Sequence, residues 1–280
     1  MSLVTPASSI HQRPFPWSLT LGLGIVLFWV VVAATIDLWA PHDPFAMVGQ
    51  RLSPPSVSHW LGTDALGRDV LIRTLYGAQY SVVMTACVVI AAVVIGSALG
   101  ALSGFLGGLA DSAIMRVVDV VLSFPPVLLA MAISASLGSG LQNAAIAMVV
   151  VWWPVYARLM RGQVLEVKSR DHVEAAIAGG ASPGRLLFKH VLPLCWTPTM
   201  VNATMDFSQV VLLAASLSFI GLGAQPPTPE WGSMISEGAA HFYSWWIAFG
   251  PGMAILSMVL GFNFVGDSLR DILDPRAQSQ

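Results

Sequence analysis

The polar residues of one apolar segment are the first candidates for chemistry in this 280-residue chain. Asp206 lies well inside the apolar run 196–222, with Asn202 four residues before it and Gln209 three residues after it. In a helix this spacing places the three side chains on one face. A polar stripe in a membrane span costs free energy unless it faces protein or water, so it predicts either the wall of a transport path or an interhelical hydrogen bond.

A second candidate is the sequence Phe124-Pro125-Pro126, which interrupts the apolar run 113–137. Proline removes a backbone donor and kinks a helix, which a membrane tolerates only where protein or water satisfies the freed carbonyls. The two prolines therefore predict either a kinked helix that lines a central cavity or a purely structural bend.

Metal and nucleotide chemistry are not indicated. The six histidines, at positions 11, 42, 59, 172, 190 and 241, include no close pair at metal-ligand spacing. Cys87 and Cys195 lie in or beside apolar runs, and we expect both to be buried packing residues. The chain has no G-x-x-x-x-G-K-[ST] phosphate loop. We therefore expect no metal site, no cofactor and no enzymatic activity in this chain by itself.

The composition indicates a membrane protein. Hydrophobic residues make up 55% of the chain and charged residues only 10%, with a mean hydropathy of +0.72. Soluble domains carry about 25% charged residues, so this chain lacks the polar groups to cover a surface in water. The net charge of −2, without any basic run, excludes the electrostatics of a nucleic-acid-binding protein.

Six apolar stretches approach the roughly 20 residues that a helix needs to cross a bilayer. They predict an all-α membrane protein with six transmembrane helices, at about residues 19–40, 80–102, 113–137, 143–159, 196–222 and 246–265.

The basic residues orient these spans, because Lys and Arg near span ends stay on the cytoplasmic side. With a cytoplasmic N-terminus, only Arg51, Arg68 and Arg73 fall outside. The other ten fall inside, which predicts that both termini are cytoplasmic: Arg13, Arg116, Arg158, Arg161, Lys168, Arg170, Arg185, Lys189, Arg270 and Arg276.

Four glycines recur every fourth residue at the end of the second span: Gly96, Gly100, Gly104 and Gly108. Such a stripe lets helix backbones approach closely in lipid. We interpret it as a packing seam within one bundle, with a dedicated dimer interface as the alternative.

The cytoplasmic loop 160–195 is unusually long and charged. Asp171 can cap a short helix that Gly179-Gly180 ends. Ser182-Pro183 is a start signal for a second helix, which we expect Pro193 to end. A helix-turn-helix with the small residues Ala175 and Ala176 on it suits docking into a groove on another protein.

Six residues of this loop, Glu174, Ala175, Ala176, Gly180, Leu192 and Pro193, have the spacing of a known motif. The segment resembles the EAA loop of ABC-importer permeases, in which the loop forms the helices that seat on the ATPase subunit. The usual isoleucine two residues before Leu-Pro is His190 here. Further blocks resemble the C-type permease of the dipeptide, oligopeptide and nickel importers, over nearly the whole chain after residue 17: residues 60–64, 67–69, 218–223, 230–232 and 266–276.

This resemblance implies a type I ABC importer permease in the bacterial cytoplasmic (inner) membrane. Its implied partners are a homologous second permease, two ATPase subunits that bind ATP and Mg, and an extracytoplasmic substrate-binding protein. Residues 1–77 would hold an N-terminal tail, the first span and an outer segment, and residues 78–276 a five-helix core with the coupling loop at 160–195. The cargo, whether peptide, nickel or a metal chelate, stays open.

The competing class is a secondary transporter driven by an ion gradient. Such proteins commonly show internal repeats and intramembrane carboxylates. This sequence offers one such carboxylate, Asp206, and no evident repeat, so the ATP-driven importer is the favoured interpretation.

Overall fold

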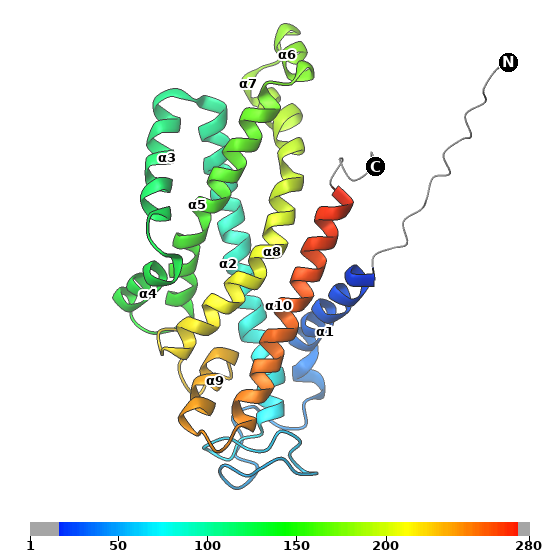
Figure 1. Cartoon of the computed structure of the whole chain (residues 1–280), viewed down its shortest axis with the longest axis vertical. Helices are drawn as coiled ribbons and strands as arrows, with labels where there is room; N and C mark the ends of the chain where they lie inside the picture. The colour runs from blue at the N-terminus through cyan, green and yellow to red at the C-terminus, as the bar shows by residue number, and fades with distance from the viewer. Residues whose placement is uncertain (1–16, 274–280) are drawn as a thin grey trace, which may run out of the picture.

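The computed structural model describes residues 17–273 and is nearly all-helical (Figure 1). In chain order its elements are α1 (Trp17–Trp39), α2 (Val70–Leu106), α3 (Gly108–Leu122), α4 (Pro126–Leu137), α5 (Leu141–Lys168), α6 (Asp171–Ala178), α7 (Pro183–Arg185), the π-helix η1 (Leu186–Val191), α8 (Leu192–Phe219), α9 (Trp231–Ala240) and α10 (Trp246–Leu273). Arg13, Arg276 and the end of the 266–276 block lie outside the described residues.

Five of the six predicted spans are single long apolar helices: α1, α2, α5, the continuous helix Pro183–Phe219, and α10. The third predicted span is divided into α3 and α4, whose axes differ by 92°. Pro125 occupies the N-cap of α4 and Pro126 its first turn, where a missing N–H has no cost. The expected kink is therefore a complete break, because the second proline begins a new helix.

Two spans extend well beyond their apolar runs. α2 has 37 residues and begins at Val70, because the Asp69 carboxylate caps it by accepting from the Ile72 N–H at 3.0 Å. The boundary expected between residues 77 and 78 thus falls inside α2. α5 continues to Lys168, so the helix runs without interruption into the predicted coupling loop.

The expectation that Pro193 ends a helix was wrong. Residues Pro183–Phe219 form one continuous helix of 37 residues, in which Pro193 lies at the first turn of α8. The widened π-turn η1 precedes this proline, and the Leu192 N–H bonds to the Leu187 carbonyl five residues back. A π-turn shifts the backbone pairing locally, which lets the helix pass a residue that has no N–H to donate.

The glycine stripe packs α2 against α5, its most extensive helix partner. A side chain at Gly96 or Gly100 would collide with the α5 backbone at Trp153 or Ala157, and Gly104 faces Val164. The interpretation as a seam within the bundle is confirmed for these three. Gly108 instead starts α3, with nothing near its absent side chain.

Figure 1 shows α6 and α7 at one end of the bundle and the connecting segments around α9 at the other, with α2, α5 and α8 running between them. We call residues 40–69 and 220–240 together the cap. Of the two cysteines, Cys195 is buried as expected, whereas Cys87 is exposed on the outside of α2. An apolar surrounding in the sequence does not separate protein core from a lipid-facing surface.

Candidate functional site

α6 is the helix expected from the loop sequence, with one change at its start. Arg170 occupies the N-cap position without a side-chain capping bond, since its guanidinium donates to Glu166 instead, and Asp171 is the first helical residue. Asp171 still stabilises the helix, because a negative charge in the first turn interacts favourably with the positive end of the helix dipole. Gly179 follows the helix, and Gly180 has the positive φ of 79° that a glycine tolerates best.

One face of α6 is rooted in the protein and the other is exposed. Val173 is fully buried and the half-buried Ala176 packs beside it, in a cluster that includes Met160 of α5 and Leu187 of η1. Glu174 and Ala175 are exposed. The structure thus leaves one of the two alanines, Ala175, free for contact with another protein.

The remaining motif residues have different positions. Gly180 and Pro193 are exposed, whereas the half-buried Leu192 packs against the same cluster as Ala176. Around α6 the exposed surface is apolar: Ile177 is 53% exposed and Phe188 71% exposed. Exposed apolar side chains on the charged, water-facing end of a membrane protein are typical of a protein contact.

α6 connects two long helices directly. It follows α5 after Lys168, whose ammonium donates to the Phe105 carbonyl at the end of α2 at 2.9 Å. It precedes the continuous helix Pro183–Phe219, which reaches the cap at its far end (Figure 1). At about 1.5 Å per residue these 37 residues span about 55 Å. Since Val173 of α6 packs with Met160 of α5 and Leu187 of the long helix, these contacts couple α6 to both helices.

The polar stripe lies in the middle of this long helix. Asp206 is half-buried and faces two donors of α5, the Trp152 indole and the Tyr156 hydroxyl. The atoms Asp206 Oδ2, Trp152 Nε1 and Tyr156 Oη are each buried, and none makes a hydrogen bond of ordinary geometry within residues 17–273.

Two hollows adjoin the stripe. A cavity of about 250 Å³ is lined by Pro126 of α4, Trp152 of α5 and Gln209 of α8. A second cavity, of about 380 Å³, is lined by Asn202 of α8 and Arg270 of α10. The structure therefore brings Pro126 and Gln209 together and places Asn202 at a separate hollow. Pro125 is exposed and does not line the hollow of Pro126.

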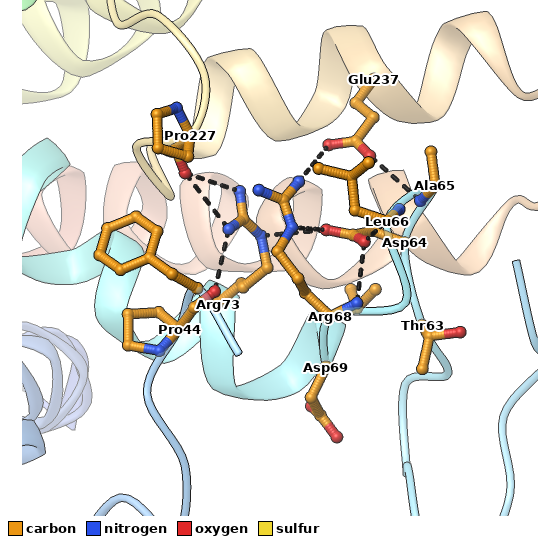
Figure 2. Close-up of polar contacts among 12 residues, drawn as sticks. Pro44, Thr63, Asp64, Ala65, Leu66, Arg68, Asp69, Arg73, Pro227 and Glu237 are labelled. Atoms are coloured by element: carbon orange, nitrogen blue, oxygen red, sulfur yellow. Dashed lines mark hydrogen bonds and ion pairs between the residues drawn. The ribbon is translucent and has the colours of Figure 1, made fainter. Parts of the chain in front are cut away.

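The cap contains a charged network that the sequence did not reveal (Figure 2). Asp64 accepts from the Arg68 backbone N–H at 3.0 Å and from Arg68 Nε at 2.6 Å. Arg68 Nη2 also lies 3.5 Å from the Glu237 carboxylate of α9. Both Asp64 and Arg68 are almost fully buried. The pair therefore binds segment 40–69 to α9.

Arg73 extends this network to segment 220–240, the second segment of the cap. Its guanidinium donates to the Pro44 carbonyl at 3.0 Å and to the Pro227 carbonyl at 3.3 Å, and its Nε lies 3.3 Å from Asp64 Oδ2. Arg68 and Arg73 are two of the three basic residues that the orientation placed outside. A four-residue spacing between Asp64 and Arg68 was visible in the sequence, but their long-range partner Glu237 was not.

α9 is fixed by its own first residues. Glu230 caps it by accepting from the Ser233 N–H at 3.0 Å, and also accepts from the Ser81 hydroxyl of α2 at 3.3 Å. Burial raises the pKa of the Glu230 carboxyl. The fully buried Trp231 donates from its indole to the Thr74 carbonyl at 2.8 Å.

A helical membrane bundle with a protruding loop at one end, a braced cap at the other and hollows beside an intramembrane polar stripe defines a transport subunit. The family described as "Binding-protein-dependent transport system inner membrane component" matches residues 96–279. The chain belongs to this family. It is a multi-pass protein of the bacterial inner membrane and the permease subunit of an ABC importer, a class that works with ATPase and substrate-binding partners.

Named relatives narrow the family. The chain is 45% identical to the "Probable D,D-dipeptide transport system permease protein DdpC" of Escherichia coli, over 92% of this chain and 88% of that protein. It is 43% identical to the di/tripeptide transport system permease protein DppC of Pseudomonas aeruginosa, with the same coverage. It is also 43% identical to the glutathione transport system permease protein GsiD of Pectobacterium atrosepticum, over 99% and 94% of the two chains. These names confirm the resemblance to the C-type permeases.

A solved structure shares the fold. A chain of the MetNI methionine ABC transporter, in an inward-facing conformation, superimposes with a TM-score of 0.59 at 23% identity. The match covers 73% of this chain and 97% of that one. At this identity the likeness establishes the ABC-importer permease fold.

Proposed function

We propose that this chain is the C-type permease of an ATP-driven peptide importer, in which α6 receives the movement of an ATPase subunit. The observation that carries the proposal is the position of α6, which exposes Glu174 and Ala175 while Val173 roots it between α5 and the long helix Pro183–Phe219. Because α6 is held between these two helices, a displacement of α6 is passed on to them.

The proposed assembly contains a homologous second permease, two ATPase subunits below and a substrate-binding protein above. ATP and Mg would be bound by the ATPase subunits, and this chain would hold no cofactor or metal. Both termini and α6 would be cytoplasmic, and the cap would face the binding protein. The exposed apolar residues Ile177 and Phe188 beside α6 support the docking surface.

The proposed mechanism is a change between two states of the bundle. Closure of the ATPase pair on ATP would displace α6, and α5 and the helix Pro183–Phe219 would follow because Val173 of α6 packs with Met160 and Leu187 of these two helices. The hollows beside Pro126, Asn202 and Gln209 would then belong to a path that opens to alternate sides. ATP drives such a change only because it binds one state better than the other.

Peptides are the favoured cargo because the relatives cited above are named for dipeptides, tripeptides and glutathione. Nickel or a metal chelate is the alternative. The test is uptake by cells that lack this gene, with and without the gene restored, using a labelled dipeptide, glutathione and nickel in parallel. Restored uptake of dipeptide or glutathione supports the proposal, and restored uptake of nickel alone contradicts the peptide assignment.

A further inference from the structure

Asp206 places a carboxylate halfway along α8 without a cationic partner in the described structure. The ion pairs formed within residues 17–273 all involve other acidic residues. A carboxylate inside a membrane protein is costly unless a cation, a proton or a polar path balances it. Since no cation within residues 17–273 balances it, the balancing group is either a proton or a group from outside this part of the chain.

The surroundings of Asp206 are built to hold the carboxylate in place. Trp152 and Tyr156 are four residues apart on α5, so the two donors lie on the same face of that helix. Tyr156 is fully buried, and its hydroxyl and the Trp152 indole N–H both face Asp206. These neutral groups orient the negative charge but do not neutralise it. Their own hydrogen bonds are incomplete, which indicates a site that is finished by another group.

Asp206 itself lines neither hollow, but its neighbours one turn away on the same face of α8 do. Gln209 lies one turn further along the same face of α8, in the cavity of about 250 Å³ that Trp152 also lines. Asn202 lies one turn before it, at the cavity of about 380 Å³. A group that moves along this face from one hollow to the other must pass Asp206.

We propose that Asp206 is a subsite for the ammonium group of the cargo, the free amino terminus of a peptide in passage, with Trp152 and Tyr156 as positioning residues. This inference rests on the proposed function, because peptides are cargo whose amino terminus is cationic at neutral pH. An ammonium offers three donors to a carboxylate whose Oδ2 has no hydrogen-bond partner within residues 17–273. Charge-assisted bonds of this kind are stronger than neutral ones, and the site releases the cargo when the path opens to the other side.

The first experiment uses the full complex in vesicles, with ATP, the binding protein and collapsed ion gradients. In Asp206→Asn we expect uptake of a dipeptide with a free amino terminus to fall about tenfold, because one hydrogen bond to a charged group is lost. Asp206→Glu should recover most of the uptake. Assembly with the second permease and the ATP hydrolysis stimulated by the loaded binding protein should stay within about twofold. Asp267→Asn, an exposed carboxylate of α10 that lines neither hollow, is the control.

The outcomes separate the explanations. Normal uptake by Asp206→Asn overturns the subsite, because the carboxyl is then neutral or merely structural. Loss of the second permease from the Asp206→Asn complex also overturns it, because a basic residue of that subunit is then the partner. A wild-type complex that takes up no peptide contradicts the proposed function itself, whereas active wild type with equally active Asp206→Asn contradicts only this inference.

A second measurement tests the chemistry of the cargo. The wild-type complex without its binding protein is titrated with the dipeptide and with the N-acetylated form of the same dipeptide. We expect the free amine to bind more tightly, by about tenfold, and Asp206→Asn to remove the difference. Equal binding of the two forms by the wild-type complex overturns the proposal.

Discussion

Arg161 of α5 presents one edge of its guanidinium to the Asp111 carboxylate of α3, with Nε–Oδ1 at 2.6 Å and Nη2–Oδ2 at 2.7 Å. The same carboxylate also accepts from the Ser103 hydroxyl of α2. Asp111 therefore joins three helices at the end of the bundle where α5 leads into α6. A second pair, Asp119 with Arg158, also joins an aspartate of α3 to an arginine of α5, but both of its side chains are exposed.

The contrast between these two pairs gives the first prediction. Arg161→Lys keeps the charge but loses the two-pronged geometry, and we expect it to destabilise the protein by about 1 kcal/mol, because the pair is partly exposed and partly screened. Thermal unfolding in detergent should show a decrease of about 2 °C. Arg158→Lys is the matched control and should leave the transition unchanged. Equal shifts for both would mean that the Asp111 pair does not hold α3 in place.

The cap network gives the second prediction. Asp64→Asn leaves the buried guanidiniums of Arg68 and Arg73 without their shared carboxylate, an error that typically costs about 3–5 kcal/mol. Limited proteolysis should cut segment 40–69 much faster than in the wild type, and thermal stability should fall. Asp43→Asn, in the same segment but exposed, should behave like the wild type. An Asp64→Asn protein with wild-type protease resistance would show that the network does not brace the cap.

The coupling loop gives the third prediction. Ala175 is exposed on α6, so Ala175→Arg should fold normally and still assemble with the second permease. Within the docking contact, however, the bulky charge should overpack the interface and cost roughly 1–3 kcal/mol or more. We expect ATP-driven uptake to fail, as measured in reconstituted vesicles. Ser112→Arg, at an exposed position of α3 outside α6 and the cap, is the control; full uptake by both variants would make α6 an ordinary solvated helix.

Orientation gives the fourth prediction. A single cysteine at Ser56 or Thr228 of the cap, in a background without Cys87 and Cys195, should react with a membrane-impermeant thiol reagent added from outside. A cysteine at Ser169, just before α6, should react only after the membrane is opened. The opposite pattern would reverse the topology. Arg68 and Arg73 lie on the side where the positive-inside rule expects few basic residues. Both are buried and paired with Asp64, so their charges are compensated.

The apolar runs predicted the spans well, because bilayer thickness fixes helix length almost independently of tertiary contacts. Local signals also placed Ser182 and Pro183 correctly at a helix start. They failed at Pro193 because the π-turn before it depends on packing that no local pattern encodes. At Pro125 the error was the reverse: a kink was expected and the helix is broken. A proline pair can either bend a helix or begin a new one, and the local sequence does not distinguish the two.

Partners that are distant in the sequence were not predictable. The contact of Asp206 with Trp152 and Tyr156 joins two helices separated by the whole coupling loop, and the contact of Arg68 with Glu237 spans most of the chain. In both cases the residue types were visible and their neighbours were not. The polar stripe was visible as a periodicity, whereas the division of its residues between two hollows required the fold.

Measuring which energy source drives uptake tests whether this chain is part of an ATP-driven importer. The purified chain is reconstituted into vesicles with its second permease, the ATPase subunits and the binding protein, and peptide uptake is measured after the proton and sodium gradients have been collapsed. We predict that uptake requires ATP and the ATPase subunits and persists without either gradient. Uptake by this chain alone, without ATPase subunits and driven by an imposed ion gradient, would contradict the account.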